Sequence, residues 1–294
     1  MVARRKGRAG RVYLAAIVIA ALTGSEVALA VDKSQYSFFR PTPDRLMREM
    51  TTDRPDTTEV PFTVDAGHFQ LETNVLGFGR SFRGPEGDVT SSFDVMTSNL
   101  RIGLTNEIEL SLVGRPYGSI RTRGPNIFDR QYGTGGFDVR MKFNIWGNDN
   151  FEAPGSTGFA LLPYITLPTD RFNGISNDKI EGGVSAIWAI KFNDTFNLGI
   201  NASIAAEQLG DVPAYRPGGI LTFSLGHAIT EKFGFYYEAI TRYGIGDGRG
   251  EIQTLGGGIT YKVNKNLQLD AGVNFGVTRA SDRVNPFVGF SARY

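Results

Sequence analysis

The sequence predicts an all-β fold: a transmembrane, antiparallel, up-and-down β-barrel of about twelve strands, preceded by a short N-terminal segment outside the barrel. Three observations lead to this prediction. The chain begins with an export signal, apolar and polar residues alternate in twelve successive segments, and short and long connections alternate between those segments. Successive side chains of a strand point to opposite faces, so the alternation gives each segment one apolar and one polar face.

Residues 1–30 contain the three parts of a secretory signal peptide. A basic stretch is followed by the apolar run VYLAAIVIAALTG, and Ala28 and Ala30 form a small-residue cleavage pattern before Val31. The apolar run is shorter than the roughly 20 residues that a membrane-spanning helix needs. We therefore expect export and cleavage near Ala30 rather than a retained helical anchor.

Residues 31–65 lack the alternation, and we predict a periplasmic or lumen-inserted segment there, followed by the barrel over residues 66–294. The run PTPDRLMREM suggests a short helix with Asp44 near its start, and the charges, threonines and prolines after it favour irregular backbone. The residues expected to bond to charges of the barrel wall from inside are Asp53, Arg54, Asp56 and Glu59. A disordered tether is the alternative.

From residue 66 onward apolar side chains recur at every second position, most clearly in residues 137–145. A soluble sandwich could contain one or two such strands, whereas repetition favours a barrel in lipid. The segments are residues 67–77, 92–104, 108–116, 137–145, 158–168, 179–192, 196–207, 221–225, 233–243, 254–263, 267–275 and 288–294. Their lengths are near the roughly 9–11 residues that a tilted strand needs to cross the hydrocarbon layer.

The connections between these segments fall into two alternating classes. Tight turns follow most even-numbered segments, at residues 105–107, 193–195, 230–232 and 264–266, with a longer one around 147–157. Longer connections follow the odd-numbered segments, at residues 79–90, 118–134, 169–178, 208–218, 244–250 and 278–285. Outer-membrane barrels have short periplasmic turns, longer external loops and an even strand count. We therefore expect a multi-pass barrel in the cell outer membrane with both termini in the periplasm.

Closure of the barrel is required because hydrocarbon offers no water to the unpaired N–H and C=O groups of an open edge. Charged residues on the polar faces are then candidates to line the lumen: Glu72, Arg101, Glu109, Arg115, Asp138, Arg140, Lys142, Glu181, Glu238, Arg242 and Asp270. The two signs interleave without the single-sign ring that sets ion selectivity. Cross-strand salt bridges are therefore favoured over a lining that screens solutes, although the two roles can overlap.

The composition excludes several kinds of site. The chain has no cysteine and two histidines, which rules out a thiolate nucleophile, a cysteine metal site and a multi-histidine cluster. His68 falls at the start of the first segment, and His227 falls on an apolar face where no serine is expected beside it. We expect no catalytic, metal or cofactor-binding residue. A formal charge of +1 gives no electrostatic footprint for nucleic acid.

The stretch TTDRPDTTEVPFTVDAGHFQLETN, residues 51–74, resembles the opening of outer-membrane transporters of the MetA-pathway phenol-degradation family. The matching positions are Thr52, Asp53, Arg54, Pro55, Asp56, Thr58, Glu59, Pro61, Val64, Gly67, Gln70 and Glu72. The resemblance implies a transporter of a group often encoded with genes for the degradation of aromatic compounds. It does not fix the substrate.

A channel or transporter for passive uptake of small molecules, hydrophobic or aromatic ones among them, is the function expected. Eight-stranded barrels are filled by side chains and barrels of 16–18 strands are open, so about twelve strands suit a narrow path. The alternatives are a lipid-modifying enzyme and a structural or adhesive barrel. The expected partners are outer-membrane lipids, an unknown small solute, and the barrel-assembly machinery, which would read the C-terminal strand FVGFSARY ending at Tyr294.

Overall fold

The computed structural model describes residues 32–169, 175–176, 179–209, 212–244 and 251–294. The predicted signal peptide and its cleavage site lie outside the described residues, as do parts of three predicted external loops. Among the described residues, the helical content is the 3-10 helix η1 (Asp44–Leu46), where the sequence predicts a short helix. No helix in the described ranges is long and apolar enough to cross a membrane.

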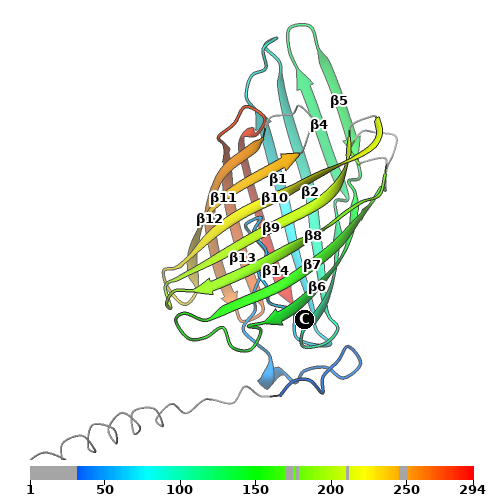
Figure 1. Ribbon diagram of the computed structural model, residues 1–294. Coiled ribbons are helices and arrows are strands. Elements are labelled where there is room, and N and C mark those ends of the chain that lie inside the picture. The colour runs from blue at the N-terminus through cyan, green and yellow to red at the C-terminus, as the bar shows by residue number, and fades with distance from the viewer. Residues whose placement is uncertain (1–31, 170–174, 177–178, 210–211, 245–250) are drawn as a thin grey trace, which may run out of the picture. The chain divides into compact units, whose positions relative to one another are not determined.

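The described chain forms one antiparallel sheet of fourteen strands (Figure 1). The strands are β1 (Phe69–Ser81), β2 (Val89–Gly103), β3 (Ile108–Gly114), β4 (Tyr117–Arg123), β5 (Phe128–Gly133), β6 (Phe137–Trp146), β7 (Thr157–Leu167), β8 (Glu181–Lys191), β9 (Phe196–Leu209), β10 (Val212–Ala228), β11 (Phe233–Gly244), β12 (Ile252–Asn264), β13 (Leu267–Gly276) and β14 (Asp282–Arg293). β1 pairs with both β2 and β14, so twelve strands close into a barrel. This confirms the predicted twelve-stranded antiparallel barrel.

The two remaining strands, β4 and β5, form a hairpin that extends beyond the barrel (Figure 1). β2 pairs with β3 along one half and with β4 along the other, so β4 continues the line of β3 past an irregularity. The predicted loop at residues 118–134 is therefore wrong for most of its length. Both faces of the hairpin carry polar side chains, and the alternation that marks strands in lipid is absent there.

A second predicted loop, at residues 208–218, is also largely strand. β9 reaches Leu209 and β10 starts at Val212, and the two pair up to that point. The glycines and prolines in this stretch predict a loop, but they lie at the outer end of the sheet, where strand pairing tolerates them. The four tight turns join consecutive strands where the sequence predicts them.

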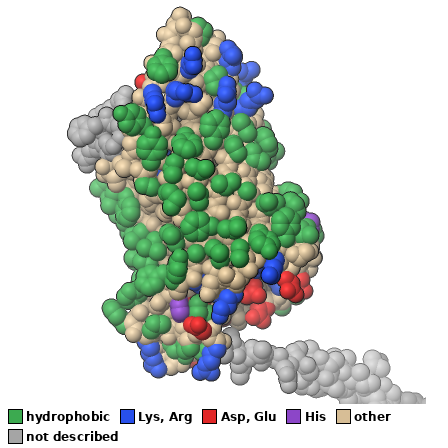
Figure 2. Space-filling model, turned by 180° about the vertical axis from the view of Figure 1, so that it is seen from behind, with side chains coloured by type: hydrophobic (Ala, Val, Ile, Leu, Met, Phe, Trp, Pro, Cys, Tyr) green, Lys and Arg blue, Asp and Glu red, His purple; other side chains and the backbone are tan. Residues whose placement is uncertain are grey.

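The barrel is polar inside and apolar outside. The largest fully buried side chains include Arg101, Lys142, Glu72 and Glu109. On the outer face, large hydrophobic side chains such as Ile204, which is 58% exposed, cover the wall in a broad band (Figure 2). A soluble protein has the opposite arrangement, whereas a barrel in hydrocarbon needs this one.

Candidate functional site

The N-terminal segment first crosses the end of the barrel that carries the tight turns, which is the end predicted to face the periplasm. The backbone N–H of Phe38 donates to the carbonyl of Leu104, and that of Thr42 donates to the carbonyl of Ala66. The guanidinium of Arg48 donates to the carbonyl of Thr63 at 3.0 Å. Residues 33–50, which we call the periplasmic cap, are thus fixed to the β2–β3 turn and to the chain just before β1.

Residues 51–62, the inserted segment, then rise into the lumen and return, as the blue chain inside the barrel shows (Figure 1). The backbone N–H groups of Asp53 and Arg54 donate to the Glu72 carboxylate at 3.1 and 2.9 Å. Those of Thr57 and Thr58 donate to the Glu238 carboxylate, each at 2.8 Å. Two wall carboxylates on separate strands, β1 and β11, therefore hold the backbone of one irregular segment, which satisfies N–H groups that no strand would pair.

The return of the chain from the lumen to β1 depends on Gly67. This residue has a positive φ of 77°, and a Cβ there would approach Pro41 to 2.7 Å. Glycine alone combines the left-handed backbone with the lack of a side chain. This geometry accounts physically for the single glycine of the stretch at residues 51–74.

Arg101 is the central cation of the site. It bonds to Glu109 at 2.9 Å and to Glu72 at 2.8 Å, and its Nε lies 3.3 Å from the Asp53 carboxylate. It also donates to the carbonyl of Phe62 at 2.8 Å. The Arg101 side chain is fully buried, so these carboxylates together supply the charge compensation that a buried guanidinium needs.

Further ion pairs link the inserted segment to other strands of the wall. Arg54 bonds to Asp270 of β13 at 2.6 Å, and Arg140 of β6 bonds to Glu59 at 2.7 Å. Lys142, which is fully buried, bonds to Asp53 at 2.9 Å. These contacts reach β6 and β13, two separate parts of the barrel wall, so the segment is fixed from more than one side.

Asp56 departs from this pattern. Burial raises the pKa of the Asp56 carboxyl well above its usual value, and the negative charge of Glu238 raises it further, against a hydrogen bond with Ser224. For Asp53, burial also acts to raise the pKa, but the charges of Arg101 and Lys142 outweigh it and bring the pKa below its usual value. Within the inserted segment, the Asp53 carboxylate is thus ionised and held, whereas ionisation of Asp56 is disfavoured.

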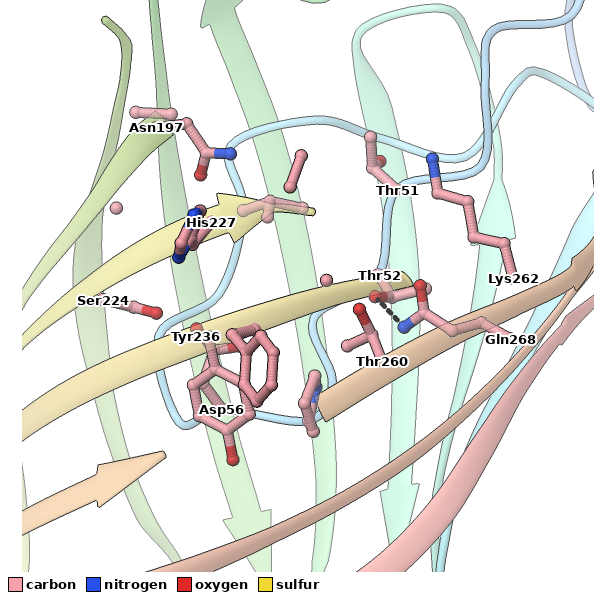
Figure 3. Close-up of a pocket in the computed structure, with 18 of the residues that line it drawn as sticks. Thr51, Thr52, Asp56, Asn197, Ser224, His227, Tyr236, Thr260, Lys262 and Gln268 are labelled. Carbon is pink, nitrogen blue, oxygen red and sulfur yellow. Dashed lines mark hydrogen bonds between the residues drawn. The ribbon is translucent and has the colours of Figure 1, made fainter. Parts of the chain in front are cut away.

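Two cavities flank the inserted segment. The outer cavity has a volume of about 440 Å³ and is lined by Tyr164, Ala205 and Arg242, among others. The inner cavity has a volume of about 500 Å³, and Figure 3 shows its lining from Thr51, Thr52 and Asp56 across to the wall strands. Asp56 and Glu59 line both cavities, so the inserted segment separates them.

Ten of the eleven predicted lumen residues bond to the N-terminal segment or line a cavity: Glu72, Arg101, Glu109, Asp138, Arg140, Lys142, Glu181, Glu238, Arg242 and Asp270. Arg115 is exposed at the junction of β3 and β4 and lines neither cavity. The sequence analysis missed Tyr164 and Tyr236 as lining residues. The signal for Tyr236 was its place on the polar face of β11, where it is 5% exposed.

Both histidines occupy structural positions. The His227 ring stacks on Phe196, with 4.5 Å between ring centroids, and lies beside Tyr237. The His68 ring lies within hydrogen-bond distance of two backbone carbonyls, those of Thr42 at 2.7 Å and Tyr294 at 3.3 Å. Neither ring is placed to activate a hydroxyl nucleophile among the described residues.

The periplasmic cap depends on Asp149, which lies in the connection between β6 and β7. Its carboxylate accepts from Lys33 and Asn106, each at 2.7 Å, and from Arg48 at 3.2 Å. Burial acts to raise the pKa of Asp149, but these hydrogen bonds and the charges of Arg48 and Lys33 outweigh it and lower the pKa.

We expect Asp149→Asn to loosen the periplasmic cap, with faster hydrogen exchange over residues 33–50 at neutral pH. Because the folded pKa lies below the unfolded one, the stabilisation is complete above the unfolded value and is lost as the pH falls through the folded value. The difference between variant and wild type should therefore vanish in acid. The control is Glu152→Gln, an exposed acid of the same connection, which should exchange like the wild type. Equal exchange of all three proteins at neutral pH would contradict this role.

Comparison with known families gives a match over residues 52–294 to the family described as "Putative MetA-pathway of phenol degradation". The chain belongs to this family. The match confirms the resemblance seen in residues 51–74 and extends it over the barrel. No curated protein matches the chain significantly.

The solved structures similar to this family member include channels and porins. The COG4313 outer membrane channel from Pseudomonas putida F1 is 10% identical, with a TM-score of 0.58 over 77% of this chain and 93% of that one. The NanC porin is 12% identical, with a TM-score of 0.45 over 76% and 98% of the two chains. The CymD monoaromatic hydrocarbon channel is 8% identical, with a TM-score of 0.42 over 77% and 88%. The first of these likenesses supports the shared fold. Because the barrel is closed and its outer wall is apolar, the MetA-pathway family member is an outer-membrane protein.

Proposed function

We propose that this family member is a channel for the passive passage of small molecules across the outer membrane. The observation that carries the proposal is the pair of cavities that flank the inserted segment and share Asp56 and Glu59. Their volumes, about 440 and 500 Å³, are in the range of sites for small molecules. A solute would pass from one to the other where the inserted segment lies against the wall.

We propose small aromatic molecules of the phenol class as the solutes. The family description points to phenol degradation, and both cavities present aromatic rings among polar groups. In the outer cavity the Arg140 guanidinium lies 6.0 Å from the centre of the Tyr164 ring. A flat ring can stack on such a pair while its hydroxyl reaches a carboxylate or amide nearby.

Uptake into proteoliposomes tests this proposal with 4-hydroxybenzoate, a phenol that crosses lipid slowly, and with 4-hydroxycyclohexanecarboxylate as its non-aromatic counterpart. We expect protein-dependent uptake of both, and faster uptake of the aromatic acid. Failure of both solutes to enter would overturn the channel assignment. Equal rates would overturn the aromatic preference alone.

Neighbouring residues of β9 provide a matched pair of variants. Ala205 lines the outer cavity and is 7% exposed, whereas Ile204 faces lipid. Ala205→Trp should fill the cavity and suppress uptake, while Ile204→Trp, which places the same indole on the lipid-facing side of the strand, should leave uptake unchanged. Suppression by both variants, or by neither, would remove the outer cavity from the path.

The alternative of a lipid-modifying enzyme receives no support from the histidines, because His227 stacks between aromatic rings and His68 lies against backbone carbonyls. A purely adhesive or structural barrel would not need two cavities on either side of an inserted segment. Passage of solutes is therefore the function that the geometry supports best.

A further inference from the structure

Arginines stand at one level across neighbouring strands at the outer end of the barrel. Arg80 of β1 is opposite Ser91 of β2, which is opposite Arg121 of β4, which in turn is opposite Arg130 of β5. Residues that face each other across antiparallel strands project from the same side of the sheet. Arg80, Arg121 and Arg130 therefore form a row on one face, which we call the arginine row, and all three are exposed.

The arginine row lies on the outer wall, next to the apolar band. Two residues closer to the membrane centre, the same register brings Phe78, Phe93 and Tyr132 onto this face. These rings are 38%, 40% and 58% exposed. Aromatic rings in such places mark the interface between hydrocarbon and headgroups. The row is thus at headgroup level, where Figure 2 shows basic side chains gathered beyond the apolar band.

Within the part of the chain that the structure describes, the positive charge of the row has no ion-pair partner. Of the ion pairs formed by the described residues, none involves Arg80, Arg121 or Arg130. Arg121 and Arg130 are directly opposite each other, an arrangement of like charges that destabilises a strand pair. Asp129 is opposite Thr122 and so projects from the other face of the hairpin. An anion from outside the chain would relieve this repulsion.

We propose that the arginine row binds the phosphate groups of lipid A, the phosphorylated glycolipid of the outer leaflet, while Phe78, Phe93 and Tyr132 contact its acyl chains. One guanidinium group can donate two parallel hydrogen bonds to a single phosphate. Three guanidinium groups in a row can therefore bind both phosphates of one headgroup. Arg130 is held over the Tyr132 ring at 5.6 Å, which fixes one guanidinium beside the apolar surface. The β4–β5 hairpin extends the wall so that it meets the headgroup layer as well as the hydrocarbon.

The test is native mass spectrometry of the full mature protein in detergent, titrated with bis-phosphorylated lipid A and with its dephosphorylated form. Lipid A carries no core oligosaccharide, so its phosphates are the charged groups that can bind. Competition with inorganic phosphate distinguishes a site for the free ion from a site for the lipid headgroup. We expect wild type to bind the phosphorylated lipid, and Arg80→Gln, Arg121→Gln and Arg130→Gln combined to weaken binding about a hundred-fold. Inorganic phosphate at millimolar concentration should not displace the lipid.

The matched control combines Arg45→Gln, Lys232→Gln and Lys265→Gln, which removes three exposed charges from the periplasmic end and should bind lipid A like the wild type. The single variant Arg130→Gln keeps the test valid if the triple variant folds poorly. This variant removes one of the three guanidinium groups, so it should bind lipid A more weakly than the wild type. Because it also removes the repulsion between Arg121 and Arg130, it should be at least as stable as the wild type. Equal binding by wild type and triple variant, equal loss in the control, or equal affinity for dephosphorylated lipid A would overturn the proposal.

Discussion

Replacement of residues 54–59 by a Gly-Ser-Gly bridge is expected to raise the single-channel conductance in planar bilayers several-fold. The bridge can close because the ends of this loop already meet: the Asp53 carboxylate accepts from the Val60 N–H at 3.0 Å. Removal of the loop joins the two cavities into one water-filled path. The wall charges it leaves, on Arg140, Glu238 and Asp270, become solvated, so the barrel escapes the penalty of buried unpaired charge.

The control for this experiment shortens the chain outside the lumen. Replacing residues 122–129 of the β4–β5 hairpin by an Asn-Gly turn removes a comparable length from beyond the barrel. Its conductance should stay at the wild-type value. A bridge variant that folds as a barrel and conducts like the wild type would show that the inserted segment is not the main barrier to ions.

The barrel strands could be predicted because their signal is local. Lipid on one side and lumen on the other impose a period of two along each crossing strand, as in residues 137–145. Apart from its base, the hairpin at residues 117–133 lies beyond the hydrocarbon, where nothing imposes this period, and it was predicted as a loop. The same physics therefore explains the correct prediction of twelve crossing strands and the failure at the hairpin.

The partners within the lumen could not be predicted from the sequence. The composition of residues 51–59 showed a charged segment, and its charged residues were candidates for contact with the wall. Which wall residue each would meet depends on barrel closure: Arg54 and its partner Asp270 are 216 residues apart. Asp56 shows most clearly why these contacts could not be predicted. It lies near another acid, Glu238, whereas a prediction based on pairing opposite charges would place it near a cation.

Arg101→Met is expected to destabilise the folded barrel by about 3–5 kcal/mol, because it leaves buried carboxylates without their cation. Glu72 and Glu109 have side chains that are 1% and 0% exposed, and Arg101 bonds to both. Methionine replaces the aliphatic part of arginine with a stem of similar shape but donates no hydrogen bond, so the carboxylates lose partners while the site stays buried. The stability of Arg101→Lys should lie between those of the wild type and Arg101→Met, since one ammonium cannot reproduce the planar set of donors of a guanidinium.

The measurement is urea unfolding of the protein in lipid vesicles, followed by tryptophan fluorescence. Lys191→Met is the control, because Lys191 pairs at 3.0 Å with Asp194, whose side chain is 92% exposed. An exposed pair of this kind contributes at most about 1 kcal/mol.

Arg101 also holds both ends of the inserted segment through the carbonyls of Thr51 and Phe62. The methionine variant should therefore show larger current fluctuations than the wild type as well as earlier unfolding. If Arg101→Met unfolds at the same urea concentration as the wild type, the carboxylates find other partners. The ion network around Arg101 would then be ruled out as the feature that fixes the segment in the lumen.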